Sequence, residues 1–281
     1  MPKYSSEHIP GMHFEKEQGR ILTYGGTICP LGCKYCFDEP VDRRGLVQLK
    51  SLMPLSAEGK VQPLPDEVSV VVPYCNTDLF IDRNEAKNNL AFWSHQGKDV
   101  AVSTKVLLSE KDIDWLLEIQ KAMAEKGNIF VLSSSIPCLG QESAHHWEPD
   151  VAAPEKRVEA LKLAHQKGLN NLVAIRPLLP DVNAAELEEI VSKTREFCSG
   201  YFAGSLRLKR NDPLLADLAQ RVSNLQVTKE AQVSWMPPGN EFCEVVRPGQ
   251  DQELQDIIAN HHQKLFAGVV DGVNFIKQIK K

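Results

Sequence analysis

Short apolar runs rich in β-branched residues alternate along the chain with longer segments whose apolar residues recur every three or four positions. The short runs predict six strands, at 21–24, 68–72, 100–103, 129–132, 172–175 and 202–208. The longer segments predict helices at 85–95, 109–125, 155–166 and 184–197. Strands that alternate with helices in this way are typical of parallel βα units, so the predicted fold class is α/β.

Two stretches do not fit this alternation. Residues 38–66 are rich in proline, glycine and charge, and they predict a long loop. The tail after residue 211 predicts two helices, at 213–222 and 250–279. We therefore divide the chain into an N-terminal extension (1–19), a main α/β domain (20–210) and a C-terminal helical extension (211–281) that packs on the main domain.

Composition and charge narrow the class of protein. The 281 residues are 42% hydrophobic and 25% charged, as in ordinary folded proteins with a large core. A formal charge of −5 makes nucleic-acid binding improbable but leaves a local basic groove open. The chain has no run of about 18 apolar residues, and its first residues are polar. We therefore expect no membrane segment and a cytoplasmic location.

Three of the seven cysteines lie within one short segment, as Cys29, Cys33 and Cys36. The uneven distribution predicts metal binding in a reducing compartment rather than a disulfide framework. Thiolates are the ligands that iron–sulfur clusters use, and three of them leave one iron of a 4Fe–4S cluster open. A zinc site is the alternative, but zinc normally takes four ligands and the chain has no second cysteine pair of the usual spacing.

Three and then two residues separate the clustered cysteines, and Tyr35 precedes the third. This motif resembles that of the radical S-adenosylmethionine (SAM) superfamily. Over about residues 24–210 the chain resembles the spore photoproduct lyase branch, also described as DNA repair photolyase-like. The segments that carry this resemblance are 74–78, 103–105, 133–135 and 148–177. The resemblance implies a partial (β/α)6 barrel of the TIM type, with a 4Fe–4S cluster and SAM as cofactors.

The resemblance also implies roles for single residues. Lys105 would pair with the SAM carboxylate, and Thr77 would hydrogen-bond the amino acid or ribose part of SAM. One serine among Ser133, Ser134 and Ser135 would do the same, while Tyr35 would pack against the adenosine. Arg176 is grouped with these cofactor-binding residues, although it and the basic residues Arg207, Lys209 and Arg210 also suit an anionic substrate.

Cys75 resembles the family cysteine that returns a hydrogen atom to a product radical. The alternative for Cys75 is a small buried hydrophobic residue without a chemical role.

The tail departs from the lyase pattern. Spore photoproduct lyase carries a basic, tyrosine-bearing hairpin that engages damaged DNA, and we predict that this hairpin is absent from residues 227–281. The expected activity is therefore that of a radical SAM enzyme, lyase-like or other, that removes hydrogen from an unidentified organic substrate. Lyase-like repair of a nucleic-acid lesion and a non-catalytic iron–sulfur protein remain alternatives. An electron donor such as flavodoxin or ferredoxin is the expected protein partner.

Overall fold

The computed structural model describes residues 12–25, 29–36, 64–229 and 242–280. In these residues ten strands form one sheet, in the order β1-β2-β3-β4-β5-β6-β7-β9-β8, and β10 also pairs with β7. The six strands from β2 to β7 are parallel to one another. They are β2 Arg20–Thr23, β3 Val70–Val72, β4 Asp99–Thr104, β5 Phe130–Ser135, β6 Asn171–Leu178 and β7 Tyr201–Lys209.

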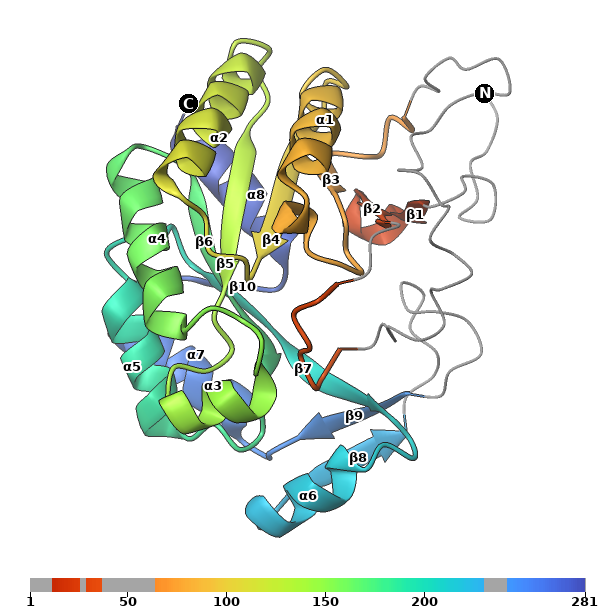
Figure 1. Ribbon diagram of the computed structural model, residues 1–281, viewed down its shortest axis with the longest axis vertical. Coiled ribbons are helices and arrows are strands. Elements are labelled where there is room, and N and C mark those ends of the chain that lie inside the picture. The colour runs from red at the N-terminus through yellow and green to blue at the C-terminus, as the bar shows by residue number, and fades with distance from the viewer. Residues whose placement is uncertain (1–11, 26–28, 37–63, 230–241, 281) are drawn as a thin grey trace.

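Four helices connect these strands and cover one face of the sheet (Figure 1). They are α1 Arg83–Trp93, α2 Glu110–Ala124, α4 Pro154–Gln166 and α5 Ala184–Thr194. All six predicted strands and all four predicted helices of the main domain are present, with ends that differ by a few residues. The predicted fold class, an α/β partial barrel, is confirmed.

Local sequence explains where the helices begin and which side they bury. Ser109 and Asp112 cap α2 reciprocally, because the Ser109 hydroxyl accepts from the Asp112 N–H and the Asp112 carboxylate accepts from the Ser109 N–H. The apolar residues of α2 then recur at helical spacing and lie buried against the sheet. These residues are Ile113, Leu116, Ile119 and Met123.

Four of the described elements before residue 200 were not predicted. Strand β1, Met12–Glu15, pairs antiparallel with β2. A short helix, α3 Gln141–Trp147, follows β5. Two short 3-10 helices, η1 Lys16–Gln18 and η3 Leu79–Ile81, complete this part of the chain. Most of the predicted loop at 38–66 lies outside the described residues.

The tail agrees with the prediction only in part. The helix predicted at 213–222 is present as α6 Leu214–Arg221, but the remainder differs. After α6, the tail comprises β8 Gln226–Lys229, β9 Phe242–Val246, α7 Gln250–Asn260, β10 Leu265–Phe266 and α8 Val269–Ile279. The single helix predicted at 250–279 is wrong, because His262 has a φ of 55° and a short strand follows it. Strands β8 and β9 form an antiparallel pair that extends the sheet beyond β7, and neither strand carries a tyrosine.

Helix α8 packs against side chains of the strands on the face opposite α1, α2, α4 and α5 (Figure 1). Val269, Val273 and Ile276 of α8 are buried in one cluster with inward-facing residues such as Ala174 and Phe202. The Lys277 ammonium also lies 2.9 Å from the Asp99 carboxylate at the start of β4. Among the described residues, no helix combines the length and apolar character that crossing a membrane requires.

Candidate active site

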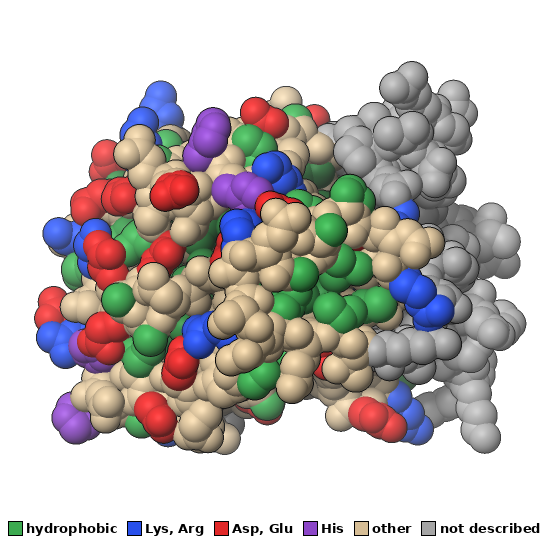
Figure 2. All heavy atoms as spheres, turned by 90° about the horizontal axis from the view of Figure 1, so that it is seen from below, with side chains coloured by type: hydrophobic (Ala, Val, Ile, Leu, Met, Phe, Trp, Pro, Cys, Tyr) green, Lys and Arg blue, Asp and Glu red, His purple; other side chains and the backbone are tan. Residues whose placement is uncertain are grey.

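A cavity of about 280 Å³ lies at the carboxyl ends of the parallel strands, where enzymes with barrel folds place their active sites. Its walls come from the cysteine segment, the loop after β3, the end of β4 and the inner faces of β6 and β7. Figure 2 views the molecule from below, where hydrophobic side chains gather near the middle of the surface. The predicted site residues that line the cavity are Cys29, Cys33, Tyr35, Cys36, Cys75, Thr77, Lys105, Ser135 and Arg176.

Only one of the three candidate serines lines this cavity. Ser135 ends β5, and its hydroxyl donates to the Arg176 carbonyl at 3.3 Å. Ser133 shares that face of β5 but lies deeper, where it is fully buried, and no described residue hydrogen-bonds its hydroxyl. Ser134 points to the opposite face, because successive side chains alternate along a strand. Ser135 therefore lines the cavity, whereas Ser133 and Ser134 do not.

The cysteine segment is fastened to the rest of the molecule at both ends. At its beginning, the Gly25 N–H donates to the Asn76 side chain at 2.8 Å, and the Asn76 amide donates back to the Gly25 carbonyl at 3.2 Å. Near its end, the Lys34 N–H donates to the Trp147 carbonyl at 3.0 Å. Gly32 has a φ of 58°, and a Cβ at this position would lie 2.6 Å from the Asp150 carboxylate. Glycine is therefore required at this turn.

A buried polar chain holds Tyr35. Its hydroxyl donates to Glu148, which forms an ion pair with Arg157, and Arg157 donates to the Ser135 carbonyl at 2.5 Å. Burial and the Glu148 charge together raise the pKa of Tyr35 well above its usual value. These polar contacts link the cysteine segment to the end of β5, so Tyr35 anchors this segment as well as lining the cavity.

Lys105 lies beside the cysteine segment. Its ammonium is 5.5 Å from the centre of the Tyr35 ring, within the range of a cation–π contact. The pKa of Cys33 is raised to about 11, chiefly because the thiol is buried, while the Lys105 charge acts in the opposite direction. Lys105 is thus close enough to Cys33, one of the candidate cluster ligands, to act on its thiol by charge.

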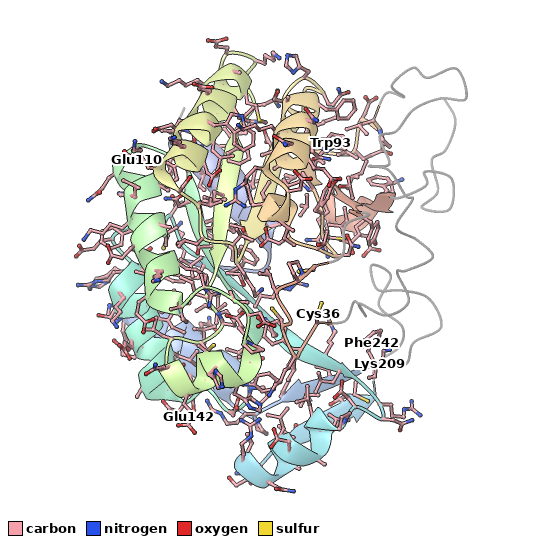
Figure 3. The ribbon with its side chains drawn as sticks, in the orientation of Figure 1. Cys36, Trp93, Glu110, Glu142, Lys209 and Phe242 are labelled. Atoms are coloured by element: carbon pink, nitrogen blue, oxygen red, sulfur yellow. The ribbon has the colours of Figure 1, made fainter. Side chains whose placement is uncertain are left out.

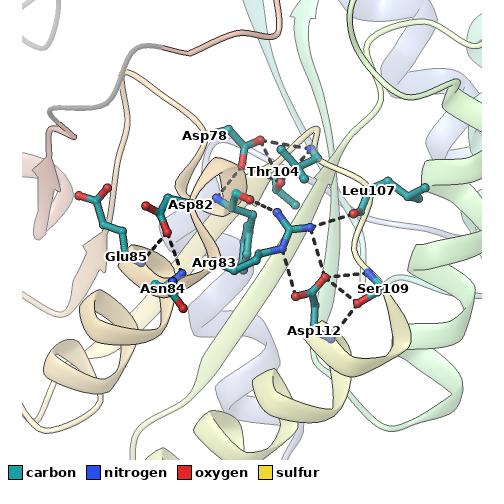
Figure 4. Close-up of polar contacts among 11 residues, drawn as sticks. Asp78, Asp82, Arg83, Asn84, Glu85, Thr104, Leu107, Ser109 and Asp112 are labelled. Carbon is teal, nitrogen blue, oxygen red and sulfur yellow. Dashed lines mark hydrogen bonds and ion pairs between the residues drawn. The ribbon is translucent and has the colours of Figure 1, made fainter.

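Asp78, which the sequence analysis left without a role, fixes the backbone at Lys105. Its carboxylate accepts from the Lys105 N–H at 2.7 Å and from the Thr104 hydroxyl at 2.9 Å (Figure 4). The same carboxylate caps η3 by accepting from the Phe80 N–H. Asp78 therefore couples the loop after β3 to the end of β4 across the cavity wall.

Cys75 lines the cavity next to Tyr24. Burial raises the pKa of the Cys75 thiol to about 12, although a hydrogen bond from Tyr24 acts in the opposite direction. The protonated thiol is therefore the stable form at neutral pH. Thr77, two residues further along, is buried, and no described residue hydrogen-bonds its hydroxyl oxygen. Because buried hydroxyls normally have partners, Thr77 is suited to contact a ligand.

Three arginines line the cavity on the side of β2, β6 and β7. They are Arg20, Arg176 and Arg207. The pKa of Arg176 is lowered to about 10, first by burial and then by the charges of Arg20 and Arg207. The sequence indicated Arg176 and Arg207, but it gave no sign of Arg20, whose inward direction depends on the register of β2 with β1.

The donor set fits an iron–sulfur cluster. Cys29, Cys33 and Cys36 line one cavity, and thiolates are the ligands that such clusters use. The buried Thr77 hydroxyl, which no described residue hydrogen-bonds, lies on the same cavity and is suited to contact a bound ligand. Figure 3 places Cys36 at the edge of the described part of this segment.

The fold is that of radical SAM enzymes. The radical SAM methyltransferase TsrM of Kitasatospora setae, solved with tryptophan and a SAM analogue, aligns with a TM-score of 0.52 and 15% identity over 90% of this chain and 55% of TsrM. SuiB of Streptococcus suis, solved with SAM, aligns with a TM-score of 0.51 and 12% identity over 89% of this chain and 51% of SuiB. The chain thus spans about half the length of these two proteins.

Other comparisons are less informative. A spore photoproduct lyase mutant aligns with a TM-score of 0.47 and 14% identity over 82% of this chain and 69% of that protein, which is too low to define the branch. An uncharacterized protein of Methanocaldococcus jannaschii, MJ0683, is 36% identical over 62 residues, which are 22% of this chain and 23% of that protein. No family model matches the chain.

Proposed function

We propose that this protein is a radical SAM enzyme that acts on an organic substrate in the cavity. The observation that carries the proposal is the placement of Cys29, Cys33 and Cys36 on one cavity with Lys105 and Cys75. An electron carrier needs only the cluster ligands. A cavity with its own cation, hydroxyl and thiol groups is suited to binding a cofactor and a substrate.

A 4Fe–4S cluster with SAM bound here would supply a 5′-deoxyadenosyl radical, which removes hydrogen atoms from organic molecules. The chain's own part is to bind and orient the reacting groups and to keep water out. Cys29, Cys33 and Cys36 would be the cluster ligands. Lys105 would hold the SAM carboxylate by its charge, and the Thr77 hydroxyl would hydrogen-bond the same cofactor.

Cys75 would return a hydrogen atom to the substrate. A hydrogen-atom donor must carry its hydrogen, and the raised pKa of Cys75 keeps this thiol protonated at neutral pH. Transfer of the hydrogen to a substrate carbon leaves a sulfur radical on Cys75, beside the Tyr24 side chain, and one electron from an external donor together with one proton would restore the thiol. An external one-electron donor of the flavodoxin or ferredoxin type would supply the cluster with its electron.

The test is anaerobic reconstitution with iron and sulfide, followed by dithionite and SAM. We expect about four irons per chain and the formation of 5′-deoxyadenosine, both abolished by Cys33→Ala. The matched control is Cys198→Ala, because Cys198 is buried away from the cavity lining. Zinc instead of iron in the purified protein, or an iron-loaded protein that leaves SAM intact, would contradict the proposal.

A further inference from the structure

We infer that Asn76 is a positioning residue, which holds Cys75 and Thr77 in place beside the cysteine segment. The inference rests on the proposed function for the roles of Cys75 and Thr77. It goes further by assigning a role to the residue between them, which acts on the reaction only through its two neighbours.

The loop after β3 keeps following the end of β2 after the strand pairing has stopped. The last paired residues are Leu22 of β2 and Val72 of β3. Beyond them, the Tyr74 N–H donates to the Thr23 hydroxyl at 3.1 Å, and the Cys75 N–H donates to the Thr23 carbonyl at 2.8 Å. The position of Cys75 therefore depends on the chain that leads from β2 into the cysteine segment.

Asn76 forms the next link between these two segments. Its side-chain oxygen accepts from the Gly25 N–H at 2.8 Å, and its amide group donates to the Gly25 carbonyl at 3.2 Å. One side chain thus binds both polar backbone groups of Gly25. This pairing needs a donor and an acceptor side by side, and at neutral pH asparagine is the one residue with a side chain of this length that has both.

Gly25 and the loop after β3 are also closely packed. A Cβ at Gly25 would lie 2.3 Å from the Tyr74 ring and 2.6 Å from the Thr77 methyl group. Tyr74 has a φ of 57°, and its hydroxyl donates to Glu85 of α1. A bulky residue keeps such a left-handed backbone only where its surroundings hold it. The bonds of Asn76 contribute to this hold.

The two bonds of Asn76 act on both of its neighbours in the sequence. Cys75 and Thr77 line the cavity on either side of Asn76 along the loop. A misplacement of a reacting group by about 1 Å can lower a rate by about 100-fold. Loss of the contact with Gly25 should therefore disturb the proposed hydrogen donor and the proposed SAM contact together.

The experiment compares Asn76→Ala and Gly25→Ala, which disturb the same contact from its two sides. The first removes both hydrogen bonds, and the second inserts a methyl group into the closely packed loop. In the iron-free full-length protein, we expect each variant to raise the rate at which iodoacetamide labels Cys75 at least about tenfold, which corresponds to about 1.4 kcal/mol. In the reconstituted protein, SAM binding per assembled cluster should weaken about two- to tenfold, as for the loss of one neutral hydrogen bond.

The matched control is Asn88→Ala, because Asn88 is exposed on α1. It should change neither the labelling of Cys75 nor the binding of SAM. If Asn76→Ala does not fold, Asn76→Ser takes its place, because the single and nearer hydroxyl of serine cannot bind both groups of Gly25.

Two results would overturn the inference. The first is a Cys75 labelling rate in Asn76→Ala equal to that of the parent protein; weaker SAM binding in that same variant would then make Asn76 a direct contact of the cofactor. The second is a Gly25→Ala variant that leaves both measurements unchanged. The labelling needs neither cluster nor SAM. It therefore decides the role of Asn76 even if the parent protein leaves SAM intact, a result that contradicts the proposed function alone.

Discussion

Replacing Glu148 by glutamine tests how the cysteine segment is held. The side chains of Glu148 and Arg157 are 1% and 2% exposed, and Tyr35 donates to the same carboxylate. Glu148→Gln removes the negative charge and leaves Arg157 buried without its ion-pair partner. Breaking a buried ion pair in this way costs about 3–5 kcal/mol. For a chain of this size we expect a fall in melting temperature of roughly 10 °C, together with a lower iron content after reconstitution.

The assay is thermal unfolding of the iron-free protein, followed by iron analysis of the reconstituted protein. Glu110→Gln is the matched control, because Glu110 forms an ion pair with Lys167 on the surface and its side chain is 65% exposed. A surface pair contributes only about 0–1 kcal/mol. The double variant Glu148→Leu with Arg157→Leu should be less destabilised than Glu148→Gln, since no charge stays buried. Equal melting temperatures for Glu148→Gln and Glu110→Gln would refute this reasoning.

Two further predictions concern the cavity, and a third concerns DNA. Lys105→Met should weaken SAM binding by about 1.5–3 kcal/mol, as expected for the loss of a charge-assisted contact, and equilibrium binding with unchanged affinity would remove Lys105 from the site. Because the pKa of Cys75 is raised to about 12, little of this thiol is ionised below that pH. Iodoacetamide at pH ~8.5, near the pKa of a free cysteine, should therefore label Cys75 far more slowly than the exposed Cys36 in the iron-free protein. Peptide mass spectrometry would measure the two labelling rates. With a net charge of −5, the protein should bind duplex DNA weakly at physiological salt, and a submicromolar, steeply salt-dependent affinity in a filter-binding assay would contradict this.

The main domain was predictable because its strands and helices have different periods. The apolar residues around Leu116 recur at helical spacing, whereas the run 129–132 is short and consists of β-branched, aromatic and other apolar residues, which favours a strand. The tail was not predictable in the same way. The apolar residues near Ile257 and near Val273 follow one helical pattern, whereas the break at His262 depends on the pairing of Leu265 and Phe266 with β7. Tertiary pairing of this kind leaves little trace in local sequence.

The candidate site, like the fold, could be predicted from the sequence only in part. The cysteine motif and the Lys105 segment are local, so the sequence indicated them directly. The residues that support them act over long separations, as Glu148 does for Tyr35 and Asn76 does for Gly25. The direction of a side chain also depends on register. Ser133 and Ser135 are equivalent in sequence, yet only Ser135 reaches the cavity, because it lies at the very end of its strand.

The tail contributes to the cavity even though the motif residues all precede it. Six parallel strands do not close into a complete barrel, and a radical reaction needs a site from which water is excluded. Val269, at the start of α8, lines the cavity, and the rest of α8 fills the space against the inner face of the sheet. Strand β9 pairs with β7 beside Arg207, at the basic end of the same cavity. Under the proposed function, the motif residues would define the cofactor chemistry, whereas the tail would limit the size and charge of the substrate that the cavity can hold.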